Sequence, residues 1–383
     1  MTNKLLIASA GAGKTHRLAK SACVAASDNK RILILTYTRS NQQEIKDRCV
    51  TLGGAKQGKI DVKGWYTFLL EDIVRPYQSI FFKNRIKSIN FNQSNPHKKG
   101  NTTIAGTAED FDAKACSVNL KHFLTSNNSM VHTEFLSKLA VRILKVTNSL
   151  AVERLCELYD HIFIDEVQDL AGWDYDLLKP IFLSMMPITC VGDFRQTIYD
   201  TTSNPKKPSS SIDKLAFYNN LKFDREELAS SRRCIQSICN YADSIHQGFG
   251  YLPTVSEVED VPDEFSDHQG LFAVKKSDIN EYIKRFEPVV LRDSVRSANY
   301  LQKNDCDKVN FGESKGRTYD RTLIVPTANI LGFINGDKDA FSSSKTDKAI
   351  NRFYVAVTRA KYSVAFVIDD SDVCKTKLAI WAP

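Results

Sequence analysis

Near its start the chain reads Leu5-Leu6-Ile7-Ala8-Ser9-Ala10-Gly11-Ala12-Gly13-Lys14-Thr15, an apolar run that ends in a glycine-rich turn. A helix-like stretch follows. Backbone N–H groups in such a turn surround phosphates, a lysine neutralises them, and a threonine hydroxyl holds Mg²⁺. We therefore predict that Ala8 to Thr15 bind a nucleotide, with Lys14 on its phosphates and Thr15 on Mg²⁺. A chance glycine-rich turn is the alternative.

Further apolar runs have the same design, because each ends in a polar turn. In the first half of the chain they are 31–37, 161–165 and 188–193. Strands that alternate with helices and carry polar residues at their carboxyl ends are typical of parallel α/β sheets. Strand candidates for a second α/β core are 288–291, 322–325 and 363–369. The pattern predicts two α/β cores in one chain.

The boundaries of these cores follow from where the alternation stops. We expect a first core over residues 1–220 and a second over residues 221–383. Between about residues 78 and 150 a polar loop at 92–101 precedes a segment with apolar residues from Phe135 to Leu144. We interpret 78–150 as a helical insertion in the first core.

Composition sets broad limits on the class of protein. The 383 residues are 42% hydrophobic, and the formal net charge of +7 mildly favours a polyanionic partner. The nine cysteines form no CxxC pair, which argues against a zinc ribbon or a disulfide framework. No apolar run approaches the roughly 20 residues of a membrane span. We expect a cytoplasmic protein with no membrane partner.

An acidic stretch follows the apolar run at 161–164. It reads Asp165-Glu166-Val167-Gln168-Asp169. One carboxylate at such a strand end can hold Mg²⁺ and a second can polarise an attacking water, as phosphoryl transfer requires. The alternative is an acidic helix start that the helix dipole favours. Together with the loop around Lys14, the stretch predicts hydrolysis of a nucleotide.

Several segments together resemble the motifs of UvrD/Rep-type superfamily 1 DNA helicases, in the order of that family. The loop that ends at Thr15 is similar to the AxAGxGKT variant, and the acidic stretch is similar to DExQD. The other segments are Thr36-Tyr37-Thr38-Arg39-Ser40, similar to TFTxxAA; Val191-Gly192-Asp193-Phe194-Arg195-Gln196-Thr197-Ile198-Tyr199, similar to GDxxQSIY; and Tyr354-Val355-Ala356-Val357-Thr358-Arg359-Ala360-Lys361, similar to YVAxTRAk. The resemblance implies two RecA-like P-loop NTPase cores that use ATP and Mg²⁺.

The resemblance also implies roles for single residues. Asp165 would hold Mg²⁺, Glu166 would act on the water, and Gln196 would sense the γ-phosphate. Arg233 and Arg359 would reach the γ-phosphate from the second core. The residues implied to contact DNA are Thr36, Tyr37, Thr38, Trp65, Tyr66, Tyr199 and Lys315.

Some positions depart from the family pattern. Arg232 stands where the family has a tyrosine that stacks on adenine, and a guanidinium can also stack there. In the segment that resembles HxxKGLE, around Lys315, Gly312 replaces the histidine and Thr318 replaces a ribose-contacting glutamate. For Tyr37 and Tyr199, burial in a core is the alternative to base stacking. These departures leave the choice between ATP and GTP open. Hydrolysis of the nucleotide is still expected.

The segment from Arg233 to Lys315 is short, so the chain has no room for the accessory subdomain of larger relatives. In its compact size the chain resembles the helicase subunit of Gabija-type anti-phage systems, which works beside an OLD-family ATPase–nuclease. The expected function is an ATP-dependent helicase or translocase on single-stranded DNA, or on a duplex with a single-stranded tail, moving 3′ to 5′. One alternative is an ATP-gated, DNA-sensing regulatory subunit that barely unwinds. Another is a different P-loop enzyme, such as a small-molecule kinase.

Overall fold

A computed structural model describes residues 2–53, 59–92, 95–112, 114, 117–198, 206–301, 304–344 and 346–383 of the chain. The chain forms two compact units. The first holds most of residues 2–226. The second holds Glu227–Pro383 together with Ile7–Gly13 and Asp193–Ile198.

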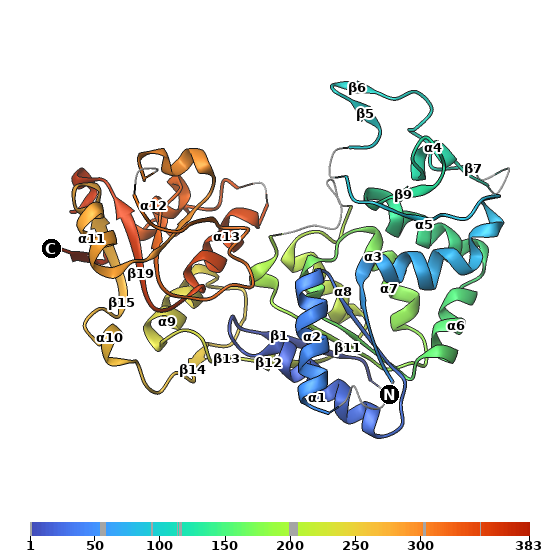
Figure 1. Cartoon of the computed structure of the whole chain (residues 1–383), viewed down its shortest axis with the longest axis horizontal. Helices are drawn as coiled ribbons and strands as arrows, with labels where there is room; N and C mark the ends of the chain where they lie inside the picture. Colours follow the sequence, from blue (N-terminus) through green and yellow to red (C-terminus); the bar gives the residue numbers. More distant parts are fainter. Residues whose placement is uncertain are drawn as a thin grey trace. The chain divides into compact units, whose positions relative to one another are not determined.

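A six-stranded sheet carries the first half of the chain (Figure 1). Its strands, in spatial order, are β12 (Asp224–Leu228), β1 (Lys4–Ala8), β11 (Ile188–Gly192), β10 (His161–Ile164), β2 (Ile32–Thr36) and β3 (Ile60–Gly64). The pairs β11–β10, β10–β2 and β2–β3 are parallel, with Ile162 between Leu33 and Ile188. Every residue of β2 and β11 is buried, as expected for parallel strands that are covered on both faces.

Helices connect these strands. They are α1 (Lys14–Ser27), α2 (Arg39–Thr51), α3 (Trp65–Phe68), α4 (Leu120–Phe123), α5 (Thr133–Val146), α6 (Leu150–Leu158), α7 (Trp173–Phe182) and α8 (Ser211–Asn220). Thr38 begins α2 as its N-cap, because its hydroxyl accepts a hydrogen bond from the Asn41 N–H at 3.1 Å. In α5, Leu136, Leu139 and Ile143 recur at helical spacing and are buried.

The helix that starts at Trp65 changes its winding twice. Four α-helical residues are followed by a π-helix at Leu69–Val74 and then by a 3₁₀-helix at Arg75–Ile80. A π-helical segment inside a helix is rare and is frequently found at functional sites. Its inward-facing residues include Leu70 and the buried Asp72, whose carboxylate pairs with Lys63 Nζ at 2.8 Å.

The segment expected to be a helical insertion is only partly helical. Over the described part of 81–132 it consists of loops, the short helix α4 and strands of two or three residues. β4 (Ser88–Asn90) pairs in parallel with β9 (Met130–His132), and two antiparallel ladders join β5 (Lys98–Lys99) to β6 (Thr102–Thr103) and β7 (Phe111–Asp112) to β8 (Ser117–Val118). The helical part of the insertion is α5, where the apolar residues from Phe135 to Leu144 lie, whereas the described part of 81–119 holds turns and short strands, because Asn, Gly and Lys without apolar periodicity favour turns.

The second unit is built on another six-stranded sheet, and its neighbouring strands are paired in parallel. Its order is β17 (Lys308–Asn310), β16 (Val289–Arg292), β18 (Tyr319–Ile324), β19 (Ala360–Ile368), β15 (Gly270–Lys275) and β20 (Ala379–Trp381). Its helices are α9 (Gln236–Ile245), α10 (Asp263–Ser266), α11 (Ile279–Phe286), α12 (Ala328–Ile334) and α13 (Lys348–Val357), and a short ladder joins β13 (Ser230–Ser231) to β14 (Val255–Ser256).

Successive residues of β19 face opposite sides of this sheet. Val364 and Phe366 pack into one hydrophobic core with α9, α12 and α13, whereas Ala365 and Val367 pack into a second core with α11. Covering both faces in this way is what buries a parallel sheet. The two sheets confirm the prediction of two RecA-like P-loop cores.

In the described ranges, every helix is too short or too polar to cross a lipid bilayer.

Candidate functional site

At one position of the glycine-rich turn after β1, the backbone has a conformation that only glycine adopts without strain. Gly11 has φ +79°, and a Cβ atom there would lie 2.7 Å from Ser231 Oγ and 2.8 Å from Arg233 Cβ. A side chain would therefore be strained and would clash. The helix α1 begins at Lys14, with Thr15 half-buried in its first turn. The first backbone N–H groups of a helix lack partners within it, so this turn offers donors to an anion.

Asp165 lies at the carboxyl end of β10 with 3% of its surface exposed. Neither of its carboxylate oxygens accepts a hydrogen bond from any described residue. Burial, and then repulsion from Glu166, raise the pKa of Asp165 to about 8. A buried carboxylate without a donor is unfavourable, and a divalent cation removes that penalty because oxygen is its preferred ligand. Asp165 and the Thr15 hydroxyl therefore fit Mg²⁺.

Glu166 has a left-handed backbone, with φ 54° and ψ 40°. For a residue other than glycine this conformation costs free energy, and it persists where the surroundings impose it. The carboxylate is held from two sides: Lys14 Nζ lies 3.7 Å from Oε2, and the Gln168 side-chain amide donates to the same oxygen. The buried Lys214 in turn donates to the Gln168 carbonyl at 2.7 Å. The turn that carries Glu166 is therefore well restrained.

In the second unit, two of the predicted γ-phosphate residues touch each other. Gln196 donates to Asp193 Oδ2 at 2.8 Å, and Arg359 Nη2 donates to Gln196 Oε1 at 3.4 Å. Arg359 is only 1% exposed, and its Nε donates to the Val355 carbonyl at 3.1 Å. Arg233 joins them through the backbone next to Arg359, because its Nη1 donates to the Thr358 carbonyl at 3.1 Å.

Sequence reasoning gave no role to Arg195, which lies one residue before Gln196. Its guanidinium is buried between the rings of Tyr251 and Tyr354, at 4.7 and 4.9 Å from their centroids. It pairs with Asp193 at 3.0 Å and donates to Ser9 Oγ at 3.0 Å. The sequence around Arg195 does not indicate that its side chain is buried between two rings. Only the fold shows this, because an exposed arginine in the same motif would have the same sequence neighbours.

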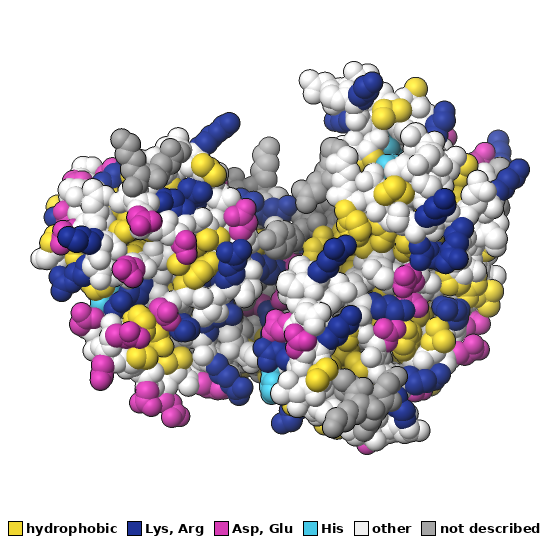
Figure 2. Space-filling model, in the orientation of Figure 1, with side chains coloured by type: hydrophobic (Ala, Val, Ile, Leu, Met, Phe, Trp, Pro, Cys, Tyr) yellow, Lys and Arg dark blue, Asp and Glu magenta, His cyan; other side chains and the backbone are white. Residues whose placement is uncertain are grey.

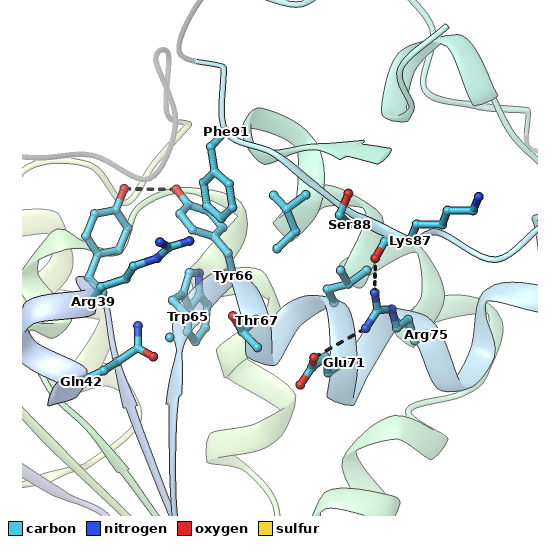
Figure 3. Close-up of a pocket in the computed structure, with 14 residues that line it drawn as sticks. Arg39, Gln42, Trp65, Tyr66, Thr67, Glu71, Arg75, Lys87, Ser88 and Phe91 are labelled. Atoms are coloured by element: carbon cyan, nitrogen blue, oxygen red, sulfur yellow. Dashed lines mark hydrogen bonds and ion pairs between the residues drawn. The ribbon is translucent and has the colours of Figure 1, made fainter. Parts of the chain in front are cut away.

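Three of the predicted DNA-contacting residues of the first unit, Tyr37, Trp65 and Tyr66, line one cavity of about 470 Å³ (Figure 3), whereas Thr36 and Thr38 do not. Tyr37 lies at the end of β2, and Trp65 and Tyr66 lie at the start of α3. The other lining residues are Arg39, Gln42, Gly64, Thr67, Leu70, Glu71, Arg75, Lys87, Ser88, Ile89 and Phe91. We call this cavity the aromatic pocket.

Three rings form one wall of the aromatic pocket. The Tyr37 and Tyr66 centroids are 5.7 Å apart and their hydroxyls 3.2 Å apart, and the Phe91 ring meets Tyr66 edge-on at 6.0 Å. Burial raises the pKa of Tyr66 well above its usual range, so the phenol stays neutral. Phe91 is 56% exposed although it is a large apolar side chain. An exposed ring beside a pocket is a surface on which a flat ligand can stack.

The aromatic pocket also has positive charge. Figure 3 shows the Arg39 guanidinium reaching toward Tyr66, and Arg39 makes no ion pair or hydrogen bond with any described residue. Arg75 is bound in place, because it donates to the Ile86 and Lys87 carbonyls and lies 3.5 Å from Glu71. On the face in Figure 2, hydrophobic side chains gather near α3 with Lys and Arg beside them. Arg39 is thus a cation available to a ligand.

Other predicted residues do not line the aromatic pocket, and Arg232 contacts the glycine-rich turn instead, because its backbone N–H donates to the Gly11 carbonyl at 3.0 Å. Arg232 is exposed and donates to Glu257 at 2.6 Å, Lys315 is half-buried in a turn, and Thr36 is buried at the end of β2. Trp65 is 1% exposed, so it lies beneath the aromatic pocket and offers no stacking face. Tyr199 lies outside the described residues. Phe91 was missed because it belongs to the insertion and to no motif.

Comparison with known proteins adds three findings. A family model described as "AAA domain" matches residues 1–202. Gabija protein GajB of Bacillus cereus (strain VD045) is 27% identical over 256 residues, which cover 64% of this chain and 47% of GajB, so the chain spans about half the length of that curated relative. The structure described as "Complex structure of Arterivirus nonstructural protein 10 (helicase) with DNA" matches with a TM-score of 0.40 and 14% identity, over 97% of this chain and 61% of that one. At that score the likeness decides nothing about function.

The family model includes the glycine-rich turn, both carboxylates after β10 and Gln196, and it matches more than half of the chain. The match to GajB confirms the resemblance to Gabija-type helicase subunits. AAA domains of this helicase-like kind use a nucleotide with a divalent metal, in agreement with the orphaned Asp165 carboxylate. This chain therefore belongs to the AAA domain family and is one of its helicase-like members.

Proposed function

We propose that this chain is an ATP-hydrolysing motor that moves on single-stranded DNA. The observation that carries the proposal is the Asp165 carboxylate, which is buried without a hydrogen-bond donor among the described residues, next to the Lys14–Glu166 ion pair. A buried carboxylate with a purely structural role would accept hydrogen bonds from other groups of the protein. A carboxylate whose oxygens bind a metal ion does not need such donors.

The protein's own groups then divide the work of hydrolysis. Bound ATP and Mg²⁺ supply the phosphorus that is attacked and the charge that activates it. The glycine-rich turn and Lys14 hold the phosphates, and Thr15 and Asp165 hold the metal. Glu166 takes the proton of the attacking water. Gln196, Arg233 and Arg359 neutralise the charge that develops on the γ-phosphate, which is the main requirement of phosphoryl transfer.

The aromatic pocket supports a single strand as the track. Its rings at Tyr37, Tyr66 and Phe91 suit an unstacked base, and the cation at Arg39 suits the phosphate beside that base. In a duplex the π-faces of the bases are covered by their neighbours, so such a pocket favours single strands. A small-molecule kinase would have no use for it.

The direct test measures ATP turnover with no DNA, with single-stranded DNA and with blunt duplex. We expect single strands to raise turnover and blunt duplex to do so far less. Strand affinity should fall with salt at a slope of about −0.7 per phosphate neutralised, because each contact releases a counterion. Equal turnover in all three conditions would rule out a DNA-driven motor.

Phe91→Ala should weaken single-strand binding by about 1–3 kcal/mol, the usual contribution of one base–aromatic stack. Because Phe91 is largely exposed, its removal opens no core cavity. Fluorescence anisotropy with a labelled oligonucleotide measures the change. Ile104→Ala is the matched control, since Ile104 is an exposed apolar residue of the same insertion outside the pocket. Equal effects of the two changes would assign the strand to another surface.

We further propose that the chain is the motor of a Gabija-type defence complex that moves 3′ to 5′ and works beside an ATPase–nuclease. The similarity to GajB supports this. Forked substrates with a 3′ or a 5′ tail resolve the direction, and only the 3′ tail should support unwinding. Co-elution with a co-expressed OLD-family ATPase–nuclease tests the partnership. Turnover driven by DNA without displacement of either fork would instead favour the DNA-sensing regulatory subunit.

A further inference from the structure

We propose that Asp174 couples the aromatic pocket to Glu166, so that ATP hydrolysis responds to a strand in the pocket. The inference rests on the proposed function, because it concerns how the strand site and the hydrolytic site of one motor communicate. Asp174 is a positioning residue in this proposal, since it touches neither ligand. All the contacts that carry it lie within the first unit.

Asp174 is fully buried in the first turn of α7, and its carboxylate joins three separate segments. Oδ1 accepts a hydrogen bond from Trp65 Nε1 at 2.9 Å and another from Ser137 Oγ on α5. Oδ2 accepts one from the Ala171 N–H at 3.0 Å. Hydrogen bonds to a buried charged group are strong and directional, so a shift of any one donor is felt by the other two segments.

The Trp65 contact leads to the aromatic pocket. Trp65 forms part of the pocket's lining from beneath, packs on Phe68 at 5.6 Å, and is followed directly by Tyr66. A base that entered between Tyr66 and Phe91 would have to displace at least one of these rings. Tyr66 and Trp65 share the first turn of α3, so a displacement of Tyr66 that shifts this turn also moves the indole N–H relative to Asp174. The change to π-helix at Leu69 leaves this turn only four residues long.

The Ala171 contact leads to the hydrolytic carboxylate. Ala171 is the second residue after the 3₁₀ turn Val167–Asp169, which begins at Glu166. That turn is anchored on its other side by the bond from Lys214 to the Gln168 carbonyl. A displacement of Ala171 therefore acts on a short, restrained segment. Its far end is Glu166, whose left-handed backbone is held by these same contacts.

Ser137 supplies an internal comparison. It donates to the same Asp174 oxygen as Trp65, but it lies on α5 and does not line the pocket. If Asp174 only stabilises the fold, loss of either donor should have similar consequences. If Asp174 transmits occupancy of the pocket, only the loss of the Trp65 donor should separate the strand from hydrolysis.

The experiment compares Trp65→Phe with Ser137→Ala in the full chain. The stimulation factor is the ATP turnover with a saturating oligonucleotide divided by the turnover without it. We expect Trp65→Phe to lower this factor by about 5–150-fold, the range of ordinary coupling between two sites. Ser137→Ala should keep it close to the wild-type value. Thermal unfolding of both variants measures any loss of stability.

A second readout excludes a purely structural role. Coupling in binding is reciprocal, so a non-hydrolysable ATP analogue should change the oligonucleotide Kd of the wild type. That change should disappear in Trp65→Phe and persist in Ser137→Ala. Asp174→Asn, which keeps the side-chain shape but sets an N–H₂ or a weaker acceptor against the three donors, should also lose it. This variant replaces Trp65→Phe in the comparison if the latter does not fold.

The outcomes separate the two proposals. If turnover of the wild type is not raised by single strands, the proposed function is wrong and the coupling with it. If the wild type is stimulated and Trp65→Phe and Asp174→Asn are stimulated as strongly, the motor remains and the coupling through Asp174 is overturned. Equal loss in Trp65→Phe and Ser137→Ala, in step with their stability, also overturns the coupling.

Discussion

Arg359→Ala is expected to lower ATP turnover by about 10³-fold or more, because an arginine that neutralises transition-state charge contributes on that scale. The guanidinium reaches Gln196, so its charge lies beside the residue expected to sense the γ-phosphate. Binding of DNA without nucleotide should change little, since that charge acts mainly in the transition state. Steady-state turnover and oligonucleotide anisotropy measure the two quantities.

Burial of Arg359 calls for controls. Arg359→Lys keeps a positive charge but cannot reproduce the planar fork of donors, and it should also turn over slowly. Arg352→Ala removes an exposed arginine from α13, the helix that ends two residues before Arg359; Arg352 pairs with Asp293, and its loss should keep turnover near the wild-type rate. Loss of strand affinity in Arg359→Ala with normal turnover would assign Arg359 to a strand-binding surface.

Glu166→Gln should preserve ATP binding and lower turnover by about 10²–10⁴-fold, the usual contribution of a general base. Glutamine keeps the shape of the side chain and removes the charge that accepts the proton. Single-turnover kinetics separates the chemical step from binding, and Lys14→Ala should instead weaken binding of the nucleotide. Glu153→Gln, on the exposed face of α6, is the matched control. Turnover at the wild-type rate in Glu166→Gln would contradict the assignment.

Local sequence was sufficient for the features that depend on adjacent residues. The strand that ends at Ala8 and the strand that ends at Ile164 are short apolar runs followed at once by polar turns, so their conformation follows from a few neighbouring residues. Three strands of the second sheet, β16, β18 and β19, were predictable for the same reason, whereas β15, β17 and β20 were not among the expected strands. Parallel strands buried on both faces read as continuous apolar runs.

Features made by distant segments were not predictable. The hydrogen bond between Trp65 and Asp174 joins residues 109 positions apart, and the sequence around either residue does not predict it. Trp65 was therefore expected to contact DNA, whereas its ring is enclosed beneath the pocket. The position of the Phe91 ring beside the pocket depends on the path of the insertion past α3. The insertion itself lacks the apolar periodicity that would have revealed its short strands.

Arg195 carries a permanent charge in an enclosed aromatic setting, balanced by Asp193 and by Asp243, whose carboxylate lies 3.4 Å from it. Loss of one member of such a group leaves an uncompensated charge inside the protein, which is strongly unfavourable. A single substitution here should therefore lower the free energy of unfolding even where the replacement residue is harmless elsewhere. We expect related sequences that differ at one of the three positions to differ at the others as well.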